Sequence, residues 1–365
     1  MLKSNYKVSI ITVVYNGAKT IEHTIQSVLN QSYKNIEYII IDGLSTDGTQ
    51  KIVEKYIDSI SYFVSEKDNG LYDAMNKGIQ KATGSMIGII NSDDWYNSYA
   101  VEKVVEYFEK NNVDLVYGKW LSVTQEGKVN EYPPEPLETI WYQMPFIHPS
   151  VFIKKNVYEN YGGFNTNYKM AADYELMLRL YTHHVKFGYL DEAIAYFQLG
   201  GLSAINKEKT VHERYAISMT YIDACPNKTD TLFWIEDAYR WDAFLLAISN
   251  GTGALARALY TYFEEKIESV CVFGTGYWGR LCYAALKDGE ITVLCFADND
   301  SSKWNTEFNG VKIVNPIELK NGKITVLIAV KDSADEIKRQ LVDIGNCSLR
   351  FVCIEELRTV CICGK

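Results

Sequence analysis

An apolar run from Ser85 to Ile90 ends directly in the polar segment Asn91-Ser92-Asp93-Asp94. The run is predicted to be a buried strand, and open α/β sheets bind their ligands at the carboxyl ends of strands. Two adjacent carboxylates in an apolar setting repel each other unless a cation or ligand hydroxyls meet them. The pair therefore suggests a divalent metal that holds a phosphorylated substrate. The alternative is that Asp93 or Asp94 caps a helix beginning near Ser98.

Three earlier segments repeat this pattern of a strand followed by a polar turn. Val8–Val14 reads as a buried strand that breaks at Tyr15-Asn16-Gly17, before a helix with an apolar inner face. The strand predicted at 36–41 ends in a turn rich in Asp, Ser, Thr and Gly over 42–49, which suits a helix start and close backbone approach. A third strand is expected over 61–65. The chain is thus predicted to have an α/β fold with several polar turns at one sheet edge.

The turns carry four ordered motifs. They are T-V-V-Y-N from Thr12, I-I-D-G-L-S-T-D-G-T from Ile40, D-N-G-L-Y-D-A-M-N-K-G from Asp68 and N-S-D-D from Asn91. This series resembles the family-2 glycosyltransferases, inverting nucleotide-sugar enzymes with the Rossmann-like GT-A fold. The likeness extends over about residues 5 to 205 and is closest to bacterial enzymes of O-antigen, capsule or exopolysaccharide synthesis. It implies a hexosyltransferase that acts on a glycan or lipid-linked oligosaccharide acceptor.

The resemblance also implies which residues bind the nucleotide-sugar donor. Asp42 would accept a hydrogen bond from the ring N–H of uracil, which favours UDP-sugars and disfavours cytosine, because cytosine lacks that donor. Asp94 would coordinate Mn²⁺ or Mg²⁺ on the diphosphate. A helix-surface salt bridge is an alternative role for Lys77. The other implied donor-side residues are Thr12, Tyr15 and Asn16 in the base pocket, Ser92 and Asp93 near the ribose or sugar, and Asp73 beside Lys77.

On the acceptor side, Asp173 falls on the family's catalytic-base position. Inversion needs one base near the attacking hydroxyl and no protein nucleophile, and the alternative for Asp173 is the N-cap of the following helix. Ala172 stands where the family usually has a carboxylate. His148, between apolar residues read as a strand, is either an acceptor-side residue or a core histidine. Trp95 is also placed on the acceptor side by the resemblance.

Several features near the end of this region stay unassigned. Short strands are expected over 185–189 and 194–197, followed by a Gly200-Gly201-Leu202-Ser203 loop that resembles the flexible end of the family's catalytic domain. Many GT-A enzymes supply a histidine metal ligand late in the domain. The sequence does not rank His183, His184 and His212 for that role.

The C-terminal part of the chain predicts a second α/β domain. Helical spacing over 206–267 indicates a connector, and a strand at 269–273 then leads into Gly274-Thr275-Gly276-Tyr277-Trp278-Gly279. This G-x-G-x-x-G, with Asp298 about twenty residues on, is typical of Rossmann-like folds and resembles small domains attached to bacterial sugar acetyltransferases. The expected domains are 1–205, 206–267 and 268–365. An NAD-dependent oxidoreductase and a non-catalytic sugar-nucleotide-binding scaffold are the alternative functions.

Composition and charge limit the partners. The 365 residues include 37 basic and 46 acidic side chains, and the net charge of −9 argues against nucleic-acid binding. Neither a membrane-span-length apolar stretch nor a signal-peptide pattern is recognised, so a cytoplasmic enzyme is expected. Peripheral contact with the inner membrane face and a homo-oligomer are compatible with this expectation. Cys361 and Cys363 lack the spacing of a zinc site.

Overall fold

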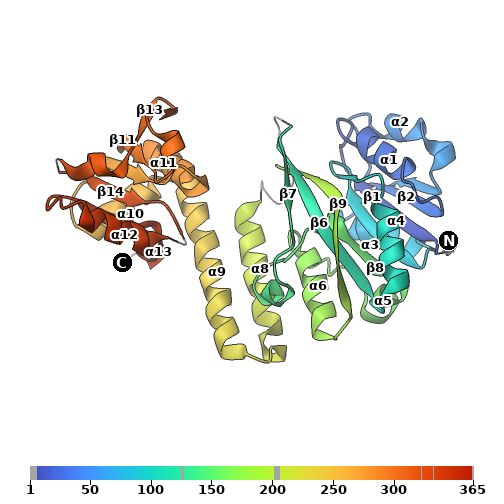
Figure 1. Cartoon of the computed structure of the whole chain (residues 1–365). Helices are drawn as coiled ribbons and strands as arrows, with labels where there is room; N and C mark the ends of the chain where they lie inside the picture. The colour runs from blue at the N-terminus through green and yellow to red at the C-terminus, as the bar shows by residue number, and fades with distance from the viewer. Residues whose placement is uncertain (1–5, 125–126, 201–205, 322, 332, 364–365) are drawn as a thin grey trace. The chain divides into compact units, whose positions relative to one another are not determined.

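The protein is described by a computed structural model over residues 6–124, 127–200, 206–321, 323–331 and 333–363 (Figure 1). It divides into two compact units, Met1–Glu236 and Asp237–Lys365. The predicted boundaries at 205 and 267 remain predictions. In the described part of the chain, no helix combines the length and apolar character needed to cross a membrane.

The first unit is built on one sheet. Its strands lie in the order β3-β2-β1-β4-β8-β6-β9-β5, with β7 paired to β6. Their bounds are β1 Val8–Val14, β2 Ile36–Asp42, β3 Tyr62–Ser65, β4 Met86–Asn91, β5 Trp95–Tyr96, β6 Leu115–Val123, β7 Val129–Tyr132, β8 Val151–Lys154 and β9 Phe187–Gln198. The strands predicted over 185–189 and 194–197 are therefore one continuous strand, β9, whose pairing with β6 shifts register around Gly118 and Lys119.

Strand direction decides which segments meet at the sheet edge that carries the predicted polar turns, called the functional edge below. Strands β1 to β4 are parallel, whereas β8 runs antiparallel to both β4 and β6. The start of β8 therefore lies at the edge where β4 and β6 end. Strand β9 is parallel to β6 and ends there too. This topology gathers the residues after β1, β2 and β4 with those before β8 and those late in β6 and β9.

Helices cover both faces of this sheet (Figure 1). Alternate residues of β1 pack on opposite sides: Ile10 joins the core under α1, α2 and α4, and Ile11 joins the core under α3, α5 and α6. Such two-sided burial is expected of parallel strands. The helices of this unit are α1 Ile21–Leu29, α2 Thr49–Glu54, α3 Leu71–Lys81, α4 Ala100–Lys110, α5 Lys155–Tyr161, α6 Ala172–Thr182 and α8 Lys207–Tyr221.

The second unit is a smaller α/β sheet, as the sequence predicts. Its strand order is β12-β13-β11-β10-β14-β15, and all neighbours are parallel except β12 and β13. The strands are β10 Ser269–Phe273, β11 Thr292–Ala297, β12 Glu307–Phe308, β13 Val311–Val314, β14 Thr325–Ile328 and β15 Arg350–Cys353. The helices are α10 Ala254–Phe263, α11 Tyr277–Asp288, α12 Ala334–Asp343 and α13 Ile354–Cys363. As predicted, the glycine-rich turn leads from β10 into α11.

Residues 206–267 are largely helical, as expected, but they contribute to two cores. Helix α9, Lys228–Ser249, places Ile235 in a core of the first unit. Farther along the same helix, Trp241 and Phe244 belong to a core of the second unit. Trp241 also packs under the guanidinium of Arg358, which lies 4.4 Å from the ring centroid. The segment is therefore part of the folded units rather than a loose linker.

A buried carboxylate ties the amino ends of β1, β2 and β4 together, away from the functional edge. Glu37 accepts hydrogen bonds from Lys7 Nζ at 2.6 Å, Ser9 Oγ at 2.5 Å and the Thr83 N–H at 2.7 Å. Burial alone would raise the pKa of Glu37, but these bonds together lower it to about 2. The ionised form is thus stabilised by folding.

We expect Glu37→Gln to lower the free energy of unfolding by about 1–3 kcal/mol at pH 7, because the amide cannot replace the charged acceptor. The folded pKa of about 2 lies below the ordinary value of 4.5, so this stabilisation is present above pH 4.5 and is lost as the pH falls toward 2. Denaturant unfolding of the wild type and variant across this range measures the difference. Glu54→Gln, on the exposed face of α2, is the control. A pH-independent difference would exclude the Glu37 charge as the cause.

Candidate active site

The turns after β1 and β2 are joined by hydrogen bonds. Asn16 has a left-handed φ of 52°, and its Oδ1 accepts from the Thr46 N–H at 2.9 Å. The Asn16 N–H donates to Ser45 Oγ at 2.7 Å. These contacts leave Tyr15 with 67% of its surface exposed at the edge of the sheet. Among the predicted base-pocket residues, Tyr15 is therefore available to a ligand and Asn16 holds the neighbouring turn.

Asp42 and Thr12 are fully buried. The Asp42 carboxylate accepts hydrogen bonds from the Ser45 N–H at 3.1 Å and from the hydroxyls of Ser45 and Ser65. Thr12 Oγ1 lies 3.1 Å from the Tyr38 hydroxyl. In this conformation both side chains stabilise the turns, and neither side chain is exposed at the surface.

Asp93 and Asp94 lie in the turn after β4. Asp94 is 1% exposed; it accepts at Oδ1 from the Gln198 N–H at 3.0 Å and at Oδ2 from Asn91 Nδ2 at 3.1 Å. Burial, and then the nearby Asp93 carboxylate, raise the pKa of Asp94 well above its usual range. Burial also raises the pKa of Asp93. Ionising both carboxylates of this turn is therefore unfavourable unless a cation lies beside them.

The chemistry of this turn fits a divalent cation. Within the described residues, Asn91 Oδ1 is buried without a hydrogen-bond partner, so an oxygen ligand is free beside the two carboxylates. Mn²⁺ and Mg²⁺ are commonly held by one or two carboxylates together with substrate phosphates. Across the described ranges, no group of three or more His, Cys, Asp or Glu forms a complete protein cage for a metal. A site shared with the substrate is the arrangement that these residues suit.

The helix-capping alternative for Asp93 and Asp94 is wrong. Helix α4 begins at Ala100 and its N-cap is Tyr99, beyond the reach of the turn. Thr24 Oγ1, on α1, instead donates to the carbonyls of Ser92 and Asp94, at 3.0 and 2.7 Å. The turn is thus anchored on α1 rather than on α4.

Asp73 and Lys77 stabilise the loop before α3. Asp73 Oδ2 accepts from the Asn69 N–H at 2.9 Å, and Lys77 Nζ donates to the Lys67 carbonyl at 2.9 Å. Lys77 also pairs with Glu66 at 2.8 Å, while its distance to Asp73 is 3.9 Å. The salt-bridge role considered for Lys77 is therefore present, and both residues act on the loop in this conformation.

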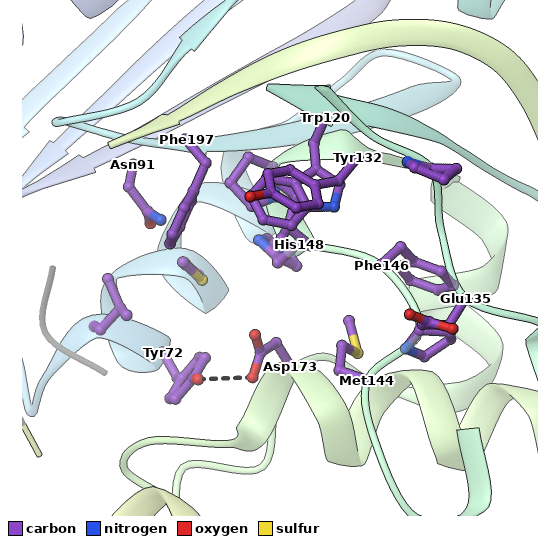
Figure 2. Close-up of a pocket in the computed structure, with 16 residues that line it drawn as sticks. Tyr72, Asn91, Trp120, Tyr132, Glu135, Met144, Phe146, His148, Asp173 and Phe197 are labelled. Carbon is purple, nitrogen blue, oxygen red and sulfur yellow. Dashed lines mark hydrogen bonds between the residues drawn. The ribbon is translucent and has the colours of Figure 1, made fainter. Parts of the chain in front are cut away.

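A cavity of about 350 Å³ brings Asp173 and His148 together (Figure 2). Tyr72 donates its hydroxyl to Asp173 Oδ1 at 3.0 Å, and the Tyr174 N–H reaches the same oxygen at 2.9 Å. Burial, followed by the nearby Asp173 charge, raises the pKa of Tyr72 well above its usual range, so the phenol stays protonated and donates. Burial lowers the pKa of His148, although Asp173 opposes this shift.

His148 occupies the short helical turn His148–Ser150 rather than the strand predicted there, since β8 starts at Val151. The start of β8 faces the end of β4, which explains why His148 and Asn91 line the same cavity. Trp95 does not line it; its ring stacks on Tyr196 at 5.2 Å.

The N-cap alternative for Asp173 is also wrong. The N-cap of α6 is Ala171, and Asp173 lies within the first turn. The backbone N–H groups of Lys169, Met170 and Ala171 donate instead to the Glu213 carboxylate of α8, at 2.8 to 3.1 Å. Glu213 thereby fixes the segment that presents Asp173.

Glu175, two residues after Asp173 on α6, is engaged elsewhere. Its carboxylate receives two bonds of 3.0 Å from Arg179 and one of 2.6 Å from the Tyr221 hydroxyl. Arg179 in turn donates to the carbonyls of Tyr161 and Gly163. This network fixes the Gly162-Gly163 loop against α6 and leaves Asp173 as the helix's carboxylate at the cavity.

Sequence reasoning missed several residues of the site. Tyr72 lies in the motif that begins at Asp68, next to the predicted donor-side residue Asp73, so the sequence could have indicated it. Glu213 and the cavity's aromatic wall had no local signal, because distant segments supply them. The missed residues are Tyr72, Asn91, Trp120, Tyr132, Phe146, Phe197, Gln198 and Glu213.

The late histidines are not assigned to the metal site by the contacts described for them. His183 Nδ1 lies 2.8 Å from the Arg179 carbonyl, His184 has a left-handed φ of 56°, and His212 lies on α8. Gly201, Leu202 and Ser203 lie outside the described residues. None of the three histidines gains support as a metal ligand from these contacts.

In the second unit, Asp298, the acidic residue of the dinucleotide-like motif, is held by the glycine-rich turn after β10 and by Lys303. Asp298 Oδ2 accepts from the Thr275 N–H and from Lys303 Nζ, both at 3.1 Å, and from the Thr275 hydroxyl. Burial alone would raise the pKa of Asp298, but these contacts lower it. No contact here favours NAD over another ligand.

Comparison with known proteins gives two family matches. Residues 9–175 match Glycosyl transferase family 2, and residues 266–349 match C2185-like, N-terminal. EpsE of Bacillus subtilis (strain 168), named as a glycosyltransferase, is 29% identical over 204 residues, which are 53% of this chain and 73% of EpsE. TuaG of the same strain, named for teichuronic acid biosynthesis, is 35% identical over 129 residues, 34% of this chain and 51% of TuaG.

Two solved structures share the fold. TarS 1-349 of S. aureus in complex with UDP aligns with a TM-score of 0.53 at 20% identity, over 68% of this chain and 74% of that one. The mannosyltransferase PcManGT of Pyrobaculum calidifontis, in complex with GDP-Man and Mn²⁺, aligns with a TM-score of 0.50 at 18% identity, over 79% and 88%. Residues 9–175, within the first unit, therefore form a family-2 glycosyltransferase domain, and this unit has the GT-A fold.

Proposed function

We propose that the chain is an inverting, metal-dependent enzyme that transfers a hexose from a UDP-sugar to a glycan acceptor in surface polysaccharide synthesis. The observation that carries this proposal is the placement of Asp173 in a cavity that also contains Asn91, beside the Asp93-Asp94 turn. A base and a diphosphate-binding turn are thus present at one sheet edge. The name of TuaG, a glycosyltransferase of teichuronic acid biosynthesis, supports a glycan product.

Asp173 is proposed as the base that removes the proton of the acceptor hydroxyl. Its two described protein hydrogen bonds both go to Oδ1, which leaves Oδ2 for the hydroxyl. Tyr72 and Glu213 are positioning residues: Tyr72 orients the carboxylate, and Glu213 holds the segment before it. A correctly oriented base typically contributes about 10²–10⁴-fold to the rate.

Asp94, with Asp93 and Asn91 beside it, is proposed to hold Mn²⁺ or Mg²⁺. When bound, the cation supplies charge that stabilises the departing diphosphate. Asp94 is oriented for this role by the Gln198 N–H and the Asn91 amide. Asp93, Ser92 and Tyr15 would complete the donor side, with Asn16, Asp42 and Thr12 shaping the turns and Asp73 and Lys77 the loop before α3.

UDP is expected to bind more tightly than GDP or CDP in the presence of Mn²⁺. The resemblance assigns uracil recognition to the turns after β1 and β2, where Tyr15 is exposed, and TarS was solved with UDP. Isothermal titration calorimetry with the three nucleotides measures the order directly. Tighter binding of GDP would contradict uracil recognition and would favour a donor like that in the PcManGT structure.

A further inference from the structure

The cavity around Asp173 has an aromatic wall built by β6, β7 and β9. Trp120 and Tyr132 are register partners on adjacent strands, and their rings stack with centroids 4.7 Å apart and an interplanar angle of 19°. Phe197 meets Trp120 edge-on at 5.9 Å. Figure 2 shows these three rings on one side of the cavity and Asp173 with Tyr72 on the other. The wall thus faces the proposed base across an open space.

This wall suits one face of a sugar ring. Ligand sites combine apolar surfaces with a few polar groups that fix orientation, and a pyranose has C–H faces with hydroxyls around its edge. Tyr132 is 43% exposed, so a ring can approach the wall from solvent. A pyranose lying against Trp120 and Tyr132 would direct edge hydroxyls toward the opposite side, where Asp173 lies.

The charges of the cavity restrict which sugar fits. Two of its lining residues are carboxylates, Asp173 and Glu135, and none of the described lining residues is Lys or Arg. His148 does not supply a dependable positive charge, because burial lowers its pKa. The nearby Lys119 lies outside the lining and pairs with Asp191 at 2.7 Å and Glu131 at 3.4 Å. An anionic sugar would thus be repelled by these carboxylates, and no cation of the described lining would compensate. Binding sites commonly exclude wrong ligands by such repulsion between like charges.

We propose that the acceptor ends in an uncharged pyranose, which lies on Trp120 and Tyr132 and offers a hydroxyl to Asp173, whereas a uronic acid or phosphorylated end is excluded. This deepens the proposed function and rests on it, because Asp173 is the base. Glu135 is a specificity-determining residue in this arrangement. Its own backbone N–H donates to the Pro145 carbonyl at 2.8 Å, which fixes the loop that carries it.

The test compares neutral and charged sugars that differ at one carbon. Methyl glycosides of glucose and galactose, and the matching glucuronide and galacturonide, are titrated into the full chain with UDP and Mn²⁺ present, with binding followed by saturation-transfer NMR. At least one neutral glycoside should bind about tenfold more tightly than its uronide. Equal or tighter binding of the uronides, or no binding of either neutral glycoside at millimolar concentrations, would overturn the proposal.

Variants identify the groups responsible. Trp120→Ala should weaken neutral-glycoside binding about tenfold and Trp120→Phe should retain most of it, because a ring remains. Tyr99→Ala, an exposed aromatic outside the cavity, is the control. Glu135→Gln should shrink the preference for neutral sugars several-fold, whereas Glu138→Gln, also outside the cavity, should not. Loss of binding in both Trp120 variants, or an unchanged preference in Glu135→Gln, would contradict the assignment.

A wrong acceptor assignment and a wrong proposed function give different results. If the chain turns over a UDP-sugar but prefers uronides, the acceptor assignment is wrong and the proposed function stands. If neutral glycosides bind through Trp120 but no nucleotide sugar binds or reacts, the proposed function is wrong.

Discussion

Asp173→Asn is expected to lower sugar transfer to the acceptor by about 10²–10⁴-fold while leaving UDP-sugar affinity close to that of the wild type. The amide preserves the size of the side chain and can keep the Tyr72 contact, which is 3.0 Å in the wild type. It cannot accept the acceptor's proton. The residual rate would come from the positioning of the two substrates.

Steady-state kinetics at saturating donor, combined with calorimetric titration of UDP, separates the chemical step from donor binding. Asp58→Asn, which changes an exposed carboxylate, controls for the loss of one negative charge. Tyr72→Phe should give a smaller decrease because the base remains. Near-normal turnover by Asp173→Asn would disprove the base assignment and direct attention to His148, since Arg179 and Tyr221 hold Glu175.

Asp94→Asn is expected to weaken Mn²⁺-dependent UDP binding by about 10–100-fold or more, because a neutral amide lacks the charge that holds the cation. The same substitution should not destabilise the metal-free fold. Burial and the Asp93 carboxylate raise the pKa of Asp94, so the Asp94 charge is unfavourable in the folded protein, and its removal should stabilise the metal-free protein. The melting temperature without metal should therefore stay equal or rise.

Calorimetry with UDP in the presence of Mn²⁺ and of EDTA, together with thermal unfolding, measures both effects. Asp93→Asn is the matched comparison: it removes the neighbouring charge and keeps Asp94, so it should retain more of the metal dependence. Full Mn²⁺-dependent affinity in Asp94→Asn would show that Asp94 does not hold the cation. A large decrease in melting temperature would show that the carboxylate is structural.

Much of the fold could be predicted because its signals are local. The continuous burial of β1 follows from its unbroken apolar run, and the inner face of α1, with Ile21, Ile25 and Val28 buried, follows from residue spacing. The same holds for the turn that leads from β10 into α11. Motif order and strand ends were also sufficient to bring Asp94 and Asp173 into one hypothesis.

The rest depends on pairings between distant segments. Tyr72 and Asp173 are 101 positions apart in the sequence, and their hydrogen bond forms only because α3 and α6 pack on the same face of the sheet. The aromatic wall requires β7 to pair antiparallel and β9 to pair parallel with β6, which brings Tyr132 and Phe197 to Trp120. No periodicity encodes such pairings. Both helix-capping alternatives were wrong for a related reason: tertiary contacts, from Gln198 to Asp94 and from Glu213 to the start of α6, decide those hydrogen bonds.

The contact between Glu213 and the start of α6 determines how short a working catalytic fragment can be. A chain cut at residue 205 would retain every proposed catalytic residue but would lose the acceptor of three backbone N–H groups just before Asp173. Ala171 is buried, and a buried donor left without its partner costs about 1–3 kcal/mol. The same cut removes Ser218, the hydroxyl partner of Tyr174 at 2.8 Å. The smallest active fragment therefore has to include α8. This helix carries no proposed catalytic residue, yet sugar transfer depends on it because it holds the segment that presents Asp173.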